Sequence, residues 1–117
     1  MSKFPARMFQ FAACFGVLEL LPLYFAPWPV HSPEMYLGFV GVALVFQAVF
    51  WVIGSNPSHY RALMPLALAE KVVFGVPALA LVARGLTAST IAVPATLDLL
   101  LGAGFFWAWR ITPKAVT

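Results

Sequence analysis

The feature that most constrains this chain is a series of four apolar stretches, each long enough to cross a lipid bilayer as a helix. They cover residues 8–25, 34–53, 61–83 and 90–109. A transmembrane helix needs about 20 predominantly apolar residues to span a hydrocarbon core of about 30 Å. Because the connections between the stretches are short, successive helices are expected to pack antiparallel. We therefore predict an all-α fold: one transmembrane domain, residues 1–117, built as a four-helix antiparallel bundle.

The composition supports a membrane environment. Of the 117 residues, 62% are hydrophobic and only 9% are charged, whereas soluble domains carry about 25% charged residues. A water-soluble fold of this composition would have too little polar surface to cover itself. The single cysteine, Cys14, cannot form an intrachain disulfide. The basic residues are scattered rather than gathered in a patch, which argues against nucleic-acid binding.

Residues that begin or end helices separate the four stretches. Residues 26–33 contain three prolines and cannot continue a helix. Gly54 is expected to be the C-cap of the second helix, and Asn56 the N-cap of the third. Gly85 is expected to end the third helix, and Thr87 to cap the fourth.

The basic residues predict the orientation in the membrane. Five of them fall on one side of the predicted bundle, and these are Lys3, Arg7, Arg61, Arg110 and Lys114. The other side has Arg84 alone. Since lysine and arginine are enriched in cytoplasmic loops, we expect both termini in the cytoplasm (N-in/C-in) and a location in a bacterial inner membrane.

Four ionisable residues lie at similar predicted depths near the middle of the membrane. With a rise of about 1.5 Å per residue, Glu19 lies roughly 16 Å from the cytoplasmic face, Glu70 and Lys71 roughly 14–15 Å, and Asp98 roughly 16 Å. A charge that faces lipid at this depth costs at least about 2.5–3.5 kcal/mol. We therefore expect these side chains to face one another inside the bundle.

Charge and helix periodicity refine this predicted cluster. Three carboxyl groups beside one ammonium leave a formal charge of −2, so at least one carboxyl should bind a proton near neutral pH. Lys71 is predicted to pair with Asp98 or Glu19. Gln47 is expected to donate a hydrogen bond at the cytoplasmic edge of the cluster. Aromatic walls are expected from Phe15, Phe74 and Phe105, so the cluster resembles an apolar pocket with a few polar groups. The candidate ligand-binding residues are Glu19, Gln47, Glu70, Lys71 and Asp98.

No arrangement of Cys, His and carboxylate residues has the spacing of a metal site, and no glycine-rich phosphate loop is present. We therefore expect neither a metal nor a cofactor. Ser89 and Thr90 have no neighbouring histidine in the sequence, so nothing indicates a serine hydrolase.

One pattern extends over most of the chain and consists of Pro57-x-x-Tyr60-Arg61-x-Leu63-Met64, then Glu70-Lys71, then Asp98. It resembles that of uncharacterised small bacterial four-helix membrane proteins, DoxX-like in overall plan. The related sterol-isomerase-like (EXPERA) group also places carboxylates in a membrane bundle. The resemblance implies acid–base chemistry on, or binding of, a lipophilic molecule. It assigns no catalytic role to any residue of this chain.

Several functions remain open at this point. The cluster could bind a lipophilic, lipid-like or quinone-like small molecule, or the chain could be an accessory subunit of a membrane complex. Alternatively, Glu70 or Asp98 could move a proton in an isomerase acting on a lipid or sterol-like substrate. A homo-oligomer could translocate protons or ions. The charges could also serve only to hold the helices together. The expected partners are membrane lipid, a lipophilic ligand, and another copy or a membrane subunit.

Overall fold

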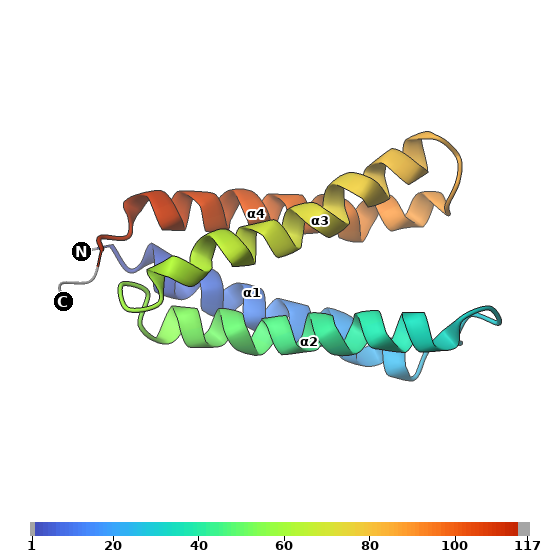
Figure 1. The fold of residues 1–117 in the computed structure, drawn as a ribbon, viewed down its shortest axis with the longest axis horizontal. Coiled ribbons are helices and arrows are strands. Elements are labelled where there is room, and N and C mark those ends of the chain that lie inside the picture. Colours follow the sequence, from blue (N-terminus) through green and yellow to red (C-terminus); the bar gives the residue numbers. More distant parts are fainter. Residues whose placement is uncertain (1, 115–117) are drawn as a thin grey trace.

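The computed structural model describes residues 2–114, and four long helices account for most of them (Figure 1). The helices are α1 (Phe4–Leu20), α2 (Pro33–Ser55), α3 (Met64–Ala83) and α4 (Ala92–Ile111). Short 3-10 turns extend three of them: η1 (Leu21–Tyr24) follows α1, η2 (Arg61–Leu63) precedes α3, and η3 (Ser89–Ile91) precedes α4.

Each helix, together with its 3-10 turn where it has one, is long and apolar enough to cross a membrane. The four segments run Phe4–Tyr24, Pro33–Ser55, Arg61–Ala83 and Ser89–Ile111. The predicted stretches are confirmed to within a few residues at each end. The first helix begins earlier than expected because Pro5 lies in its first turn, where the missing N–H has no helical partner to lose.

The end of α3 is formed as predicted. Gly85 adopts a left-handed conformation with φ of +70°, which glycine tolerates without steric cost. The N–H of Gly85 donates to the carbonyl of Val82 at 3.0 Å, and the N–H of Leu86 donates to the carbonyl of Leu81 at 2.9 Å. These two bonds satisfy carbonyls that the end of the helix would otherwise leave free.

The other predicted caps are wrong. Gly54 lies inside α2, where a Cβ would come within 2.9 Å of the Ala6 carbonyl oxygen of α1, so it serves close helix packing. The Asn56 side chain accepts a hydrogen bond from the His59 N–H at 3.4 Å and thus stabilises the connecting turn instead of capping α3. Thr87 does not cap α4, because the η3 turn leads into that helix through backbone hydrogen bonds.

The helices form two hairpins, α1 with α2 and α3 with α4, which pack against each other mainly at one end (Figure 1). The start of α1, the end of α4 and the α2–α3 connection lie at that end, which we call the terminal end. At the opposite end, called the distal end, the two hairpins diverge. The contacts within each hairpin are extensive, whereas α2 and α3 touch each other little.

An aromatic core holds the two hairpins together near the terminal end. Phe9 of α1 stacks on Phe105 of α4 with ring centroids 4.2 Å apart, and Phe50 of α2 meets Phe105 edge-on at 4.9 Å. All three rings are fully buried. Met64 and Ala67 of α3 belong to the same cluster, so every helix contributes to this core.

Large apolar side chains cover much of the exterior. Exposed examples are found on each of the four helices and include Phe11, Leu18, Val45, Leu66, Val76 and Leu100. Monomeric soluble proteins rarely expose contiguous apolar patches beyond a few hundred Å². A surface of this kind is the one that a helical bundle presents to lipid tails.

Candidate functional site

Lys71 lies between two carboxylates near the middle of the helices. Its Nζ donates a hydrogen bond to Asp98 Oδ1 at 3.4 Å and lies 3.5 Å from Glu70 Oε1. Only 3% of Lys71 is exposed. The predicted pairing of Lys71 with Asp98 is therefore confirmed, and Glu70 is a second partner of the same ammonium group.

The packing of α3 on α4 explains how Lys71 is buried. It faces Gly102 of α4, where a Cβ would lie 3.3 Å from the Lys71 Cβ. The absence of a side chain at Gly102 allows the lysine to lie along α4 and reach Asp98. Its Nζ also lies 5.0 Å from the centre of the Phe50 ring, a favourable cation–π distance. Lys71 thus connects its own hairpin to Phe50 of the other hairpin.

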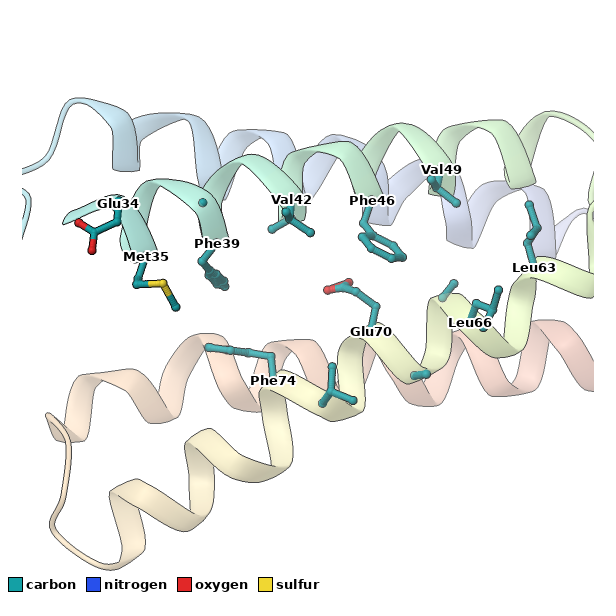
Figure 2. Close-up of a pocket in the computed structure, with 15 residues that line it drawn as sticks. Glu34, Met35, Phe39, Val42, Phe46, Val49, Leu63, Leu66, Glu70 and Phe74 are labelled. Atoms are coloured by element: carbon teal, nitrogen blue, oxygen red, sulfur yellow. The ribbon is translucent and has the colours of Figure 1, made fainter. Parts of the chain in front are cut away.

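Glu70 projects from a different side of α3, because adjacent residues on a helix point about 100° apart. Its carboxylate points away from α4 toward α2, close to Phe46 (Figure 2). Oε1 is buried and has no hydrogen-bond partner among residues 2–114, although it lies near the Lys71 ammonium. The Glu70 side chain is 17% exposed, and that exposure is toward the space between α2 and α3.

That space is a groove of about 1060 Å³ between the two hairpins. One wall comes from α2, and its lining residues are Glu34, Met35, Gly38, Phe39, Val42, Ala43, Phe46 and Val49. The other wall comes from η2 and α3, and its lining residues are Leu63, Leu66, Ala67, Ala69, Glu70, Val73 and Phe74.

The groove has a clear internal order (Figure 2). Glu34 lies at its distal end, and Leu63 and Leu66 lie toward its terminal end. Between them, Phe39 and Phe74 approach from opposite walls, with ring centroids 5.5 Å apart. The Glu70 carboxylate is the charged group at mid-length, surrounded by apolar side chains.

Glu19 of α1 is half-buried and makes no ion pair or hydrogen bond with this cluster among residues 2–114. The predicted convergence of charges is therefore confirmed for α3 and α4, whereas the part assigned to Glu19 stays a prediction.

Gln47 does not take its predicted place. The side-chain Nε2 donates to the Ala43 carbonyl one turn earlier at 2.8 Å, and the Oε1 atom lies against Gly16 of α1. Gln47 is 2% exposed, and its Oε1 has no hydrogen-bond partner among the described residues. It therefore belongs to the interface between α1 and α2 and lies outside the groove.

The predicted aromatic walls are partly wrong. Phe74 lines the groove, but Phe105 is fully buried in the aromatic core and Phe15 packs against that core. The α2 wall was not predicted. Its members recur at helical spacing and are Met35, Phe39, Val42, Phe46 and Val49. This spacing is visible in the sequence, but it does not indicate which neighbouring helix these side chains face.

Comparisons with protein-family models, with curated proteins and with solved structures find no match to this chain. Within residues 2–114, no three His, Cys, Asp or Glu side chains lie close enough together to hold a metal ion. The features that can indicate a function are therefore the groove and the ionisable side chains in and beside it.

Proposed function

We propose that this chain is an integral membrane protein that binds a lipophilic small molecule in the groove between α2 and α3. The observation that carries this proposal is an apolar groove of about 1060 Å³ with one carboxylate, Glu70, at mid-length. Sites for small molecules are typically clefts of about 300–1,000 Å³, lined by apolar side chains with a few polar groups.

The proposal places the four helices across a bacterial inner membrane with the terminal end in the cytoplasm. The excess of basic residues at that end supports this orientation. One of these residues, Arg61, is also part of the fold: its Nε donates to the Thr112 carbonyl at 2.8 Å, and its guanidinium lies 5.2 Å from the Trp109 ring. The resemblance to DoxX-like proteins is in keeping with a lipophilic ligand.

In this orientation, the groove would open sideways into the membrane. Its walls belong to different hairpins, and these diverge toward the distal end (Figure 1). A molecule dissolved among the lipid tails could therefore reach Glu70 without crossing the aromatic core. Lys71 and Asp98 would support the site from behind, because Lys71 holds one oxygen of the Glu70 carboxylate.

An isomerase on a lipid or sterol-like substrate is less well supported. Such chemistry needs two groups that can exchange protons with one bound molecule. Of the predicted acids, Glu70 lines the groove, whereas Asp98 is paired with Lys71 and is not among the lining residues. Binding therefore accounts for the geometry with fewer requirements than catalysis.

Photolabelling with an alkyl chain that carries a diazirine and no headgroup would test the binding site. The full-length protein is placed in phosphatidylcholine vesicles, and labelled residues are mapped by mass spectrometry. We expect Phe46 in the groove to be labelled more strongly than Val45, which is exposed on another side of α2.

Two tryptophan variants provide the matched comparison. Val42→Trp adds a large ring inside the groove, and Val45→Trp adds the same ring outside it. Relative to the unsubstituted protein, we expect the first variant to lower the labelling of Phe46 strongly and the second to leave it unchanged. Equal labelling of Phe46 in both variants would show that the probe was contacting bulk lipid and would refute the proposed site.

A further inference from the structure

We infer that the molecule bound in this groove is a lipophilic cation, with its positive group beside Glu70 and its apolar part along the walls of α2 and α3. This inference rests on the proposed binding function and specifies the chemical class of the ligand. Its first support is the set of side chains that line the groove.

The lining offers nothing that would hold an anion. Among the described residues that form it, there is no lysine, arginine, histidine, amide or hydroxyl group. Its ionisable side chains are both glutamates, Glu34 and Glu70. Beyond the first turn of α2, the backbone N–H groups of the two helical walls donate to carbonyls of their own helices. A bound anion would therefore be desolvated beside carboxylates and without a donor.

The charge balance around Lys71 favours a further cation. Glu70 and Asp98 share one ammonium group, at 3.5 and 3.4 Å, so these three side chains carry a net charge of −1 when all are ionised. Without a bound cation, that excess is the reason to expect a proton on one carboxyl. A positive group beside Glu70 would neutralise that excess in a region of low dielectric constant, where opposite charges attract strongly.

The aromatic side chains suit the same ligand class. Phe46 and Glu70 point toward each other from opposite walls of the groove, and the stacked pair Phe39 and Phe74 lies on the distal side of them (Figure 2). The faces of aromatic rings attract cations, most strongly where water is excluded. A carboxylate combined with several phenylalanine rings is therefore a suitable environment for an alkylated ammonium group.

Glu34 adds a second carboxylate at the distal end of the groove. It precedes Phe46 by twelve positions on α2, which corresponds to roughly 18 Å along the helix axis. It is exposed, so its effect on a bound molecule is screened by water. Its negative charge at the distal end would raise the local concentration of cations there.

The test uses three spin-labelled chains of equal length: octadecyltrimethylammonium, octadecanol and octadecanoate. Each probe is added to vesicles of zwitterionic phosphatidylcholine that contain the full-length protein, and electron paramagnetic resonance gives the immobilised fraction. We expect the cation to associate roughly tenfold more strongly than the alcohol, the scale of one charge-assisted contact. The carboxylate probe should associate most weakly.

Substitutions at Glu70 identify the group responsible. Glu70→Gln keeps the shape of the side chain but removes its charge, so the preference for the cation over the alcohol should disappear. Glu70→Asp keeps the charge and should retain most of that preference. A preference that survives Glu70→Gln, or that both variants lose equally, would overturn the inference.

The outcomes also separate this inference from the proposed function. If the alcohol is immobilised as strongly as the cation, and Val42→Trp releases both, the groove binds lipophilic molecules without selecting charge, and the inference fails alone. If Val42→Trp changes no probe relative to Val45→Trp, the groove is not a binding site and both conclusions fail.

Discussion

Replacing Lys71 by methionine removes the ammonium group between Glu70 and Asp98 while keeping most of the apolar length of the side chain. At distances of 3.5 and 3.4 Å, each attraction is about 5 kcal/mol at an effective dielectric constant of 20. The cost of burying the charges offsets much of this gain. Removing one member of a buried ion pair typically costs about 3–5 kcal/mol, because the remaining charge is uncompensated. We therefore expect Lys71→Met to lower the free energy of unfolding by about 3–5 kcal/mol.

The Asp98→Asn variant should lower the free energy of unfolding by less, about 1.5–3 kcal/mol, because Lys71 keeps Glu70 as a partner. Lys71 and Asp98 are in contact at 3.4 Å, and contacting residues are energetically coupled. The double variant should therefore lower the free energy of unfolding by at least about 1 kcal/mol less than the sum of the two single variants. Unfolding by sodium dodecyl sulfate in mixed micelles, followed by circular dichroism and tryptophan fluorescence, gives the three free energies of unfolding.

A matched control is Val72→Met, which places the same side chain on an exposed part of α3 outside the groove and should change the free energy of unfolding by less than about 0.5 kcal/mol. Additivity of the Lys71 and Asp98 effects within about 0.5 kcal/mol would mean that the two side chains do not interact. That result would remove the support that Lys71 is proposed to give Glu70.

Three further substitutions test other parts of the structure. Gly16→Ala should reduce the free energy of unfolding by about 1–3 kcal/mol, because the new Cβ overlaps the Gln47 carboxamide; an equal loss in a Gln47→Ala background would contradict this cause. Arg61→Lys should cost about 1–2 kcal/mol in the same assay, since an ammonium cannot reproduce a guanidinium that binds two carbonyls at the end of α4; a neutral substitution would show that these contacts contribute nothing. In a cysteine-free background, an impermeant maleimide should label Ser32→Cys in intact cells and Ser58→Cys only after lysis; the reverse pattern would invert the proposed orientation.

The pairing of Lys71 with Asp98 could be predicted from the sequence, because it depends on how deep each residue lies in the membrane. Helix rise is nearly constant, so the distances of Lys71 and Asp98 from their helix ends placed them at the same height. The high cost of exposing a charge to lipid then required that they meet. The observed ion pair at 3.4 Å follows from these two constraints.

The groove could not be predicted in the same way, because α2 is apolar on nearly all sides. Without a polar face, periodicity does not show whether Phe39 and Phe46 face α1, α3 or lipid. The polar side chain in mid-helix, Gln47, was assigned to the charged cluster, yet it packs where Gly16 leaves room on α1. Which hairpin surfaces meet depends on side-chain shapes across several helices.

Gly54 and Phe105 also show that packing between helices could not be predicted from the sequence. Gly54 has the sequence context of a C-cap, but its position inside α2 reflects close packing against α1. Phe105 shares a helix face with Asp98 and was therefore expected to line the site. It lies two turns nearer the terminal end, where stacking on Phe9 at 4.2 Å buries it completely.

If the groove binds a ligand as proposed, the position of the aromatic core affects which molecules it accepts. Phe9, Phe50 and Phe105 join the two hairpins near one end. A small change in the angle between the hairpins at these rings therefore produces a larger displacement at Glu34, far along α2. The size of molecule that fits between the walls is then governed partly by side chains that never touch it. Substitutions that loosen the ring stacking would be expected to broaden the range of accepted ligands before they unfold the protein.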